Sequence, residues 1–112
     1  MLLFAAGIAL GLPGDLSQEA KLTASDGANG DFFGASVSLA GDTAIICANK
    51  DNSTLGAAYV FNRTESNWLQ TAKLAALDSF IGDGFGNSIA HEVDTTVVGA
   101  SANSSSPGAA YV

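Results

Sequence analysis

The sequence has little of what catalysis, metal binding and crosslinking usually require. Its 112 residues include one cysteine, one histidine, two prolines and four basic residues. The single cysteine, Cys47, excludes an intrachain disulfide and a cysteine-based metal site, and we expect it to be buried as a small apolar side chain. The single histidine, His91, excludes a histidine-rich metal site. These scarcities favour a function that does not depend on reactive side chains.

The shortage of basic residues also limits the partners of the chain. Eleven acidic residues against four basic ones give a net charge of −7. An acidic chain repels phosphate backbones, so we expect no nucleic-acid partner. Hydrophobic residues make up 47% of the chain, which excludes wholesale disorder and suits one domain with a modest core.

Only residues 1–12 form a long apolar run, and this run contains no Lys or Arg. It is too short to cross a bilayer, which takes about 20 residues. We separate residues 1–15 as an apolar N-terminal segment with three interpretations: a signal-like segment, the remnant of a preceding strand, or a stretch foreign to the natural protein. We expect no membrane insertion by the rest of the chain.

An internal repeat organises the remaining sequence. At an offset of 52 residues, segments 20–60 and 72–112 give 41 gapless pairs, of which 19 are identical. This period belongs to the length class of propeller and solenoid repeats. We assign residues 16–67 to a first repeat and residues 68–112 to a second, truncated repeat.

Each repeat has the pattern of four short strands separated by turns rich in Gly, Asp and Asn. We predict strands at 33–39, 44–48 and 56–62 in the first repeat, followed by a fourth strand at 68–76. Gly34 and Gly86 follow an aromatic residue at a strand start, where a positive φ or a close neighbouring chain requires glycine. The pattern predicts an all-β fold with two four-stranded antiparallel blades.

The repeated motifs resemble the FG-GAP repeat. They are Phe33-Gly34-Ala35-Ser36-Val37-Ser38-Leu39-Ala40-Gly41-Asp42, Ile45-Ile46-Cys47-Ala48-Asn49 and Gly56-Ala57-Ala58-Tyr59-Val60-Phe61, with Phe85-Gly86 and Val97-Val98-Gly99-Ala100-Ser101 in the second copy. The resemblance covers residues 16–112. It implies blades of a β-propeller, here an incomplete ring, similar to those of integrin α-subunits and of secreted bacterial and algal proteins. Neither copy keeps the proline of the GAP element.

The resemblance does not carry over the calcium site of the family. That site lies between the FG and GAP strands, where this chain has only the short turns 40–43 and 91–94. Calcium takes six to eight oxygen ligands, so these turns do not suffice. The loop around Asp26, Asn29 and Asp31 is a weak alternative, to be weighed against a solvated turn. We expect no cofactor, with calcium as the one candidate.

The sequence offers no catalytic constellation. His91 aligns with Leu39 of the first copy, which indicates a substitution at a strand end. No phosphate-binding Gly loop followed by Lys-Ser or Lys-Thr occurs. Asp26 and Asp31 form an acidic pair without the apolar cover that would raise a carboxyl pKa. We therefore predict that the chain is not an enzyme.

Three Asn-x-Ser/Thr sequons, at Asn52, Asn62 and Asn103, are glycosylation candidates. Together with the resemblance, they favour an extracellular or cell-surface recognition or adhesion module whose ligand is an unknown protein or carbohydrate. Two alternatives are an accessory propeller of a secreted hydrolase and a structural spacer.

Two blades leave their flanks open. We expect these flanks to expose apolar strand residues and to favour self-association. The residues that we expect to be exposed are Val37, Leu39, Ile45 and Tyr59.

Overall fold

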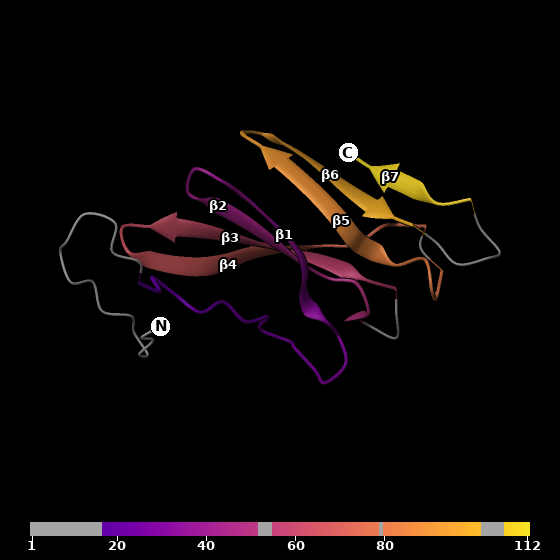
Figure 1. The fold of residues 1–112 in the computed structure, drawn as a ribbon, viewed down its shortest axis with the longest axis horizontal. Coiled ribbons are helices and arrows are strands. Elements are labelled where there is room, and N and C mark those ends of the chain that lie inside the picture. Colours follow the sequence, from indigo (N-terminus) through magenta and orange to yellow (C-terminus); the bar gives the residue numbers. More distant parts are fainter. Residues whose placement is uncertain (1–16, 52–54, 79, 102–106) are drawn as a thin grey trace.

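The computed structural model describes residues 17–51, 55–78, 80–101 and 107–112 (Figure 1). These residues form seven strands: β1 (Phe33–Ala40), β2 (Thr43–Ala48), β3 (Ala57–Thr64), β4 (Asn67–Leu74), β5 (Phe85–Glu92), β6 (Thr95–Ala100) and β7 (Ala109–Tyr111). The predicted all-β fold is confirmed. The described part of the chain contains no helix that is long and apolar enough to cross a membrane.

The strands form two antiparallel sheets, which we call the first and second blades. The first blade has the order β1-β2-β3-β4, as predicted, and the second has the order β5-β6-β7. The prediction of a fourth strand in the second blade is not met within the described residues. At the 52-residue offset, the counterpart of β4 would come after Val112, which is the last residue of the sequence.

Strand β4 belongs to the first blade, although most of it lies in the second sequence repeat. It pairs with β3 in a register that places Leu74 opposite Ala58 and Lys73 opposite Tyr59. The sequence repeat and the structural blade are therefore out of phase by one strand. By the same offset, residues 17–22 are the counterpart of the part of β4 that begins at Leu69, yet they form no strand in this structure.

The blades stack because the first sheet is apolar on both faces. Its forward face, which carries Ile45, Cys47 and Ala58, packs against the second blade. The surface that it meets there is the rear face of the second blade, formed by Phe85, Val98, Ala100 and the half-buried Tyr111. Two hydrogen bonds join β1 to β5: Ser36 Oγ donates to Gly86 O (2.7 Å), and His91 N donates to Ser38 Oγ (3.0 Å).

The rear face of the first blade forms a second apolar cluster, made of Ala44, Ala48, Ala57, Tyr59 and Phe61. The segment that leads into β1 lies against this face through Leu22 and Ala24. Leu22 and Ala24 are the counterparts of Leu74 and Ala76, and Ala76 packs against the core between the blades. In both repeats, the incoming chain thus lies against the rear face of its blade.

The prediction of exposed flank residues is half right. Val37 and Leu39 are 62% and 67% exposed, as expected, but Ile45 and Tyr59 are buried, at 2% and 0%. Ile45 is covered by the second blade, and Tyr59 belongs to the rear-face cluster with the incoming segment. The expectation failed at these positions because it ignored the cover that the neighbouring blade and the incoming chain provide.

The FG glycines have the backbone conformation that the sequence predicts. Gly34 and Gly86 have φ values of 98° and 99°, which glycine adopts at little cost. A Cβ atom at Gly86 would lie 2.9 Å from Cys47 Cβ, whereas one at Gly34 would meet nothing within 4 Å. The two glycines therefore share a backbone conformation, but only Gly86 has a neighbouring blade against it.

Candidate functional site

Four polar residues meet at one end of the first blade and form what we call the Asp26 cluster: Asp26, Asp51, Tyr59 and Lys73. The Tyr59 hydroxyl donates to Asp26 Oδ1 (2.8 Å), and Lys73 Nζ donates to Asp26 Oδ2 (2.6 Å). Lys73 Nζ also pairs with Asp51 Oδ2 (2.8 Å) and lies 5.2 Å from the centre of the Tyr59 ring. The cross-strand pairing of Tyr59 with Lys73 places both side chains in reach of the loop.

The charges in the Asp26 cluster stabilise one another. The hydrogen bonds from Lys73 and Tyr59 hold the pKa of Asp26 below its ordinary value. Burial, together with the Asp26 carboxylate, raises the pKa of Tyr59 to about 12. Burial disfavours the charged form of Lys73, but the contacts with Asp26 and Asp51 outweigh it and raise the pKa of this lysine. At neutral pH the cluster therefore holds charged Asp26 and Lys73 beside a neutral Tyr59.

The second blade repeats part of this arrangement. The Tyr111 hydroxyl donates to Asp78 Oδ1 (3.0 Å), as Tyr59 does to Asp26, and the contact raises the pKa of Tyr111. Within the described residues, however, no lysine pairs with Asp78. The second copy therefore keeps the tyrosine and the aspartate of the cluster and lacks its cation.

A second pair of equivalent bonds shapes the acidic loops. The backbone N–H of Ala28 donates to Asp31 Oδ2 (2.9 Å), and that of Phe80 donates to Asp83 Oδ2 (2.8 Å). Each loop also has a return bond, from Asp31 N to Ala28 O and from Asp83 N to Phe80 O. Both acidic loops are thus closed by the same local hydrogen bonds.

A small cavity lies between each acidic loop and the strand ends of its blade. In the first blade it measures about 310 Å³, and its lining includes Asn29, Asp31, Phe33 and Tyr59. In the second blade it measures about 180 Å³, and its lining includes Phe80, Asp83 and Tyr111. A cavity of this size at the end of a blade suits a side chain or a single sugar ring rather than a large ligand.

The candidate cation residues are only partly brought together. Both carboxylate oxygens of Asp26 already accept bonds, and Asp31 Oδ2 is taken by the backbone of Ala28. Asn29 and Asp31 line the same cavity. Within the described residues, no group of three or more His, Cys, Asp or Glu side chains is placed to hold a metal ion. A cation at Asp26 would have to displace Lys73, so calcium binding here stays a prediction.

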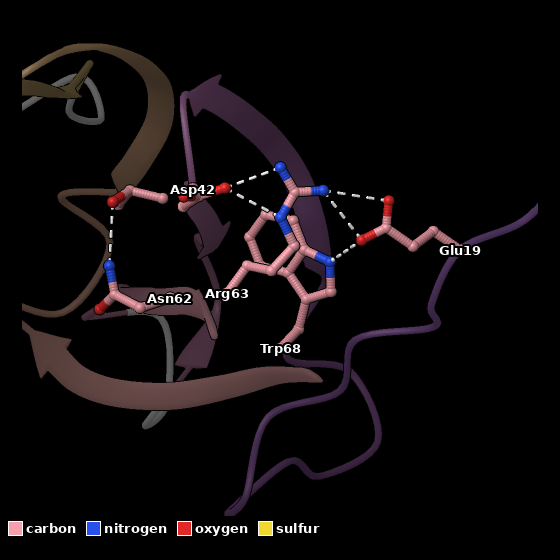
Figure 2. A network of polar contacts seen from close by, with 6 residues as sticks. Glu19, Asp42, Asn62, Arg63 and Trp68 are labelled. Carbon is pink, nitrogen blue, oxygen red and sulfur yellow. Dashed lines mark hydrogen bonds and ion pairs between the residues drawn. The ribbon is translucent and has the colours of Figure 1, made fainter. Parts of the chain in front are cut away.

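A second polar network, the Arg63 clamp, ties the incoming segment to the first blade (Figure 2). It consists of Glu19, Asp42, Arg63 and Trp68. Arg63 donates to both carboxylate oxygens of Glu19 (3.0 and 3.1 Å) and to Asp42 Oδ1 (2.7 Å), and its guanidinium lies 5.2 Å from the Trp68 ring. Trp68 Nε1 also donates to Glu19 (2.8 Å). The bonds from Trp68 and Arg63 keep the pKa of Glu19 below its ordinary value.

Of the glycosylation candidates, only Asn62 lies among the described residues; Asn52 and Asn103 lie outside them. Asn62 is half-buried on β3, and its Nδ2 donates to Thr43 Oγ1 (2.9 Å). Because glycosylation replaces one of the two hydrogens on this nitrogen, a glycan at Asn62 would have to share Nδ2 with the bond to Thr43. Glycosylation at all three positions stays a prediction.

The side chains of His91 and Cys47 make contacts within the fold. The His91 ring contacts Thr96 Oγ1 through Nδ1 (2.8 Å), and its backbone N–H joins the two blades. Cys47 is fully buried, as predicted, and burial raises the pKa of its thiol. A thiol with a raised pKa is a poor nucleophile at neutral pH.

The loop tips differ between the repeats although their framework is the same. At equivalent positions, the first loop carries Ser25, Ala28 and Asn29, whereas the second carries Leu77, Phe80 and Ile81. Phe80 and Ile81 are 76% and 70% exposed. The second loop therefore presents large apolar side chains to solvent on a backbone that hydrogen bonds fix.

Two stacked antiparallel sheets related by a 52-residue repeat define the class of this protein: it is built from β-propeller blades. A model of the FG-GAP repeat matches residues 16–61 and 68–112, so the chain belongs to the FG-GAP repeat family. Comparison with curated proteins gives no match, and comparison with solved structures gives none either. FG-GAP repeat domains are generally non-catalytic and typically occur in extracellular or surface proteins.

The sequence interpretation missed the partners of Asp26, namely Tyr59, Lys73 and Asp51. A signal for one of them was present, because Asp26 and Tyr59 are both identical to their counterparts, Asp78 and Tyr111. Two polar positions that are retained together in a diverged repeat indicate a bond between them. The Glu19–Arg63 pair carried no such signal, since Glu19 aligns with Thr71.

Proposed function

We propose that this chain is part of a non-enzymatic extracellular recognition module that binds a protein or carbohydrate ligand at its loop tips. One observation carries the proposal: the two acidic loops share a hydrogen-bonded framework but differ at their exposed tips. A rigid framework lowers the entropic cost of binding, and divergent tips allow each blade to contribute different contacts.

The internal pairing of the acidic residues supports a non-catalytic role. Asp26 is held by Lys73 and Tyr59, and Asp31 is held by its own loop. General acid–base catalysis needs a carboxyl group that is free to exchange a proton with the substrate. Carboxylates held in structural bonds are better suited to fixing the shape of a loop.

The apolar tip of the second loop is the part that we expect to contribute most to binding. Burial of a large apolar side chain is worth about 1.5–3 kcal/mol, and Phe80 and Ile81 are both free to be buried by a ligand. We expect the paired change Phe80→Ser and Ile81→Ser to weaken binding by at least about tenfold.

The experiment uses a printed glycan array and an array of purified extracellular proteins as probes. Leu69→Ser is the matched control, because Leu69 is an exposed apolar residue on β4 away from the loops. The proposal predicts a bound probe whose affinity falls in the tip variant and not in the control. Equal affinity for both variants would contradict it, and binding to no probe would favour the spacer alternative. Turnover of a bound glycan would contradict the non-enzymatic role.

A further inference from the structure

The phenylalanine that precedes the FG pair of the first repeat has an unusual backbone conformation. Phe32 has a φ of 63°, in the left-handed region, whereas its counterpart in the second repeat is Gly84, with a φ of 69°. A bulky residue is strained in this region, and glycine is not. The first repeat therefore keeps a strained aromatic residue at a position where glycine would serve the fold better.

The packing of the described residues does not account for this strain. The Phe32 side chain is 58% exposed and belongs to neither of the two apolar clusters. The ring makes a cation–π contact with Lys50, whose Nζ lies 5.2 Å from the ring centre. A cation–π contact at an exposed site is weak. Strain that the fold does not offset is typical of residues that contact a ligand.

The two repeats use this position for different groups. In both, the residue three positions later donates a backbone bond to it: Ala35 N to Phe32 O and Asn87 N to Gly84 O, both at 3.0 Å. A Cβ at Gly84 would clash with the side-chain oxygen of Asn87, so the second repeat holds this amide beside a glycine. The first repeat has Ala35 in place of Asn87, which leaves room for a ring. Phe32 and Ala35 thus differ together from their counterparts, as expected for a ring that is retained for its own contacts.

Lys50 gives the exposed ring a positive neighbour at a fixed place. Its backbone N–H donates to the carbonyl oxygen of Asp31 (3.1 Å), which directly precedes Phe32. Lys50 is exposed and forms no ion pair within the described residues, whereas Arg63 and Lys73 are both paired with carboxylates. The Lys50 ammonium group is therefore available to an anionic ligand.

We propose that Phe32 and Lys50 form a binding site for a sugar that carries a carboxylate, such as a uronic acid. The apolar C–H face of a pyranose packs on an aromatic ring, and an ammonium group pairs with a carboxylate. The 5.2 Å between the Lys50 ammonium and the ring centre suits a ligand whose carboxylate is attached directly to its ring. This site rests on the recognition function proposed above, for which it supplies the class of ligand.

A row of polar side chains beside Lys50 favours a sugar over an acidic peptide. Asn49 precedes Lys50, and its Nδ2 donates to Asn87 Oδ1 (3.4 Å) across the junction of the blades. Asn87 Nδ2 in turn donates to Ser101 Oγ (2.8 Å), and both Asn87 and Ser101 are exposed. The row lies at the same end of the blades as Phe32, because the starts of β1 and β5 pair with the ends of β2 and β6. Amide and hydroxyl groups both donate and accept hydrogen bonds, which suits the hydroxyl groups of a sugar.

The charge of the whole chain limits the ligand to few negative charges. The net charge is −7, and Lys50 offers a single positive group at the site. Repulsion from the rest of the chain grows with the charge of the ligand. We therefore expect a sugar with one carboxylate to bind and a sulfated polysaccharide not to bind.

An NMR titration of the full chain with methyl glucuronide and methyl galacturonide tests the site. Methyl glucoside and methyl galactoside are the matched neutral ligands. We expect the uronides to bind with a dissociation constant of about 1 mM, as suits a small ligand at an exposed site. The neutral sugars should bind at least about fivefold more weakly, since they lack the ion pair with Lys50. Raising the salt from about 20 mM to about 500 mM should reduce this difference.

Phe32→Gly separates binding from folding, because it introduces the residue of the second repeat. Thermal melts should show a stability equal to or above that of the parent chain, whereas the affinity for the uronides should fall at least about tenfold. Lys50→Met keeps the apolar stem and should lower the affinity for the uronides to that for the neutral sugars. Lys21→Met, at another exposed lysine, is the control and should bind as the parent chain does.

Several outcomes would overturn the inference. They are unchanged uronide binding by Phe32→Gly, a melting temperature of this variant well below that of the parent chain, and neutral sugars or a Gly-Glu-Gly peptide that bind as tightly as the uronides. Binding on the arrays that depends on Phe80 and Ile81 and not on Phe32 would overturn this site alone and leave the recognition function in place. Binding to no probe would overturn both.

Discussion

Alanine substitution at the two FG glycines, Gly34 and Gly86, measures how tightly the two blades pack against each other. Gly34 and Gly86 have nearly the same positive φ, and each follows a phenylalanine at a strand start. An alanine at either position incurs about 1–2 kcal/mol of backbone strain, partly offset by the lower entropy of the unfolded chain. These two contributions are the same at both sites, so they cancel when the two variants are compared.

The difference between the variants comes from packing. A Cβ at Gly86 would lie 2.9 Å from Cys47 Cβ and 3.3 Å from Ala57 O, whereas one at Gly34 meets no atom within 4 Å. Forcing an extra carbon into a packed core costs about 1–3 kcal/mol. We therefore expect Gly86→Ala to lower the free energy of unfolding by about 1–3 kcal/mol more than Gly34→Ala does.

Urea unfolding at low chain concentration measures this difference. With a denaturant slope of about 1–1.5 kcal/mol/M, the midpoint of Gly86→Ala should lie about 0.7–3 M below that of Gly34→Ala. Gly86→Ala should cost less in a Cys47→Gly background than in the parent chain, because Cys47→Gly removes the atom that the new methyl group meets. Equal midpoints for the two alanine variants would refute the claim that the blades are in close contact at Gly86.

Three further predictions concern single positions. Val93 has a φ of 42° in a turn where the first repeat has Gly41, so Val93→Gly should stabilise the fold by about 0.5–1 kcal/mol and Gly41→Val should destabilise it, as thermal melts can show. Tyr59 has a pKa raised to about 12 from 10, so its neutral form stabilises the fold below pH 10. Stability should fall as the pH rises from about 10 to 12, and Tyr59→Phe should reduce that fall in urea titrations. Lys73→Met leaves the buried Asp51 without its cation and should cost about 1–3 kcal/mol, less than a fully buried pair because the Lys73 side chain is 35% exposed. Asp51→Asn in the same background should recover part of this loss in a double-mutant cycle.

The sequence predicts the strands well because the repeat and the alternating pattern act together. Strands predicted at 33–39 and 44–48 appear as Phe33–Ala40 and Thr43–Ala48. The last predicted strand, 68–76, is found two residues shorter at its end, as Asn67–Leu74. Alternation marks the middle of a strand, but the hydrogen bonds of its neighbour determine where pairing stops.

The contacts between distant loops were harder to predict. Asp51 lies in a stretch that reads as a polar loop, yet it is buried and pairs with Lys73 from β4. Its neighbours in the sequence give no sign of this, because burial comes from strands that are adjacent only after folding. The burial of Ile45 likewise depends on the second blade. Repeat comparison can reveal pairs that both copies retain, such as Asp26 with Tyr59, but not pairs found in one copy alone.

The shift of one strand between sequence repeat and blade affects how a protein of this kind can change in length. Since β4 completes the first blade but belongs mostly to the second repeat, each repeat supplies the closing strand of the blade before it. Duplication or loss of one 52-residue unit then leaves each blade that is followed by another repeat with its closing strand, wherever within the unit the exchange occurs. A gene built from such units can therefore gain or lose blades by unequal recombination without a new joint having to evolve.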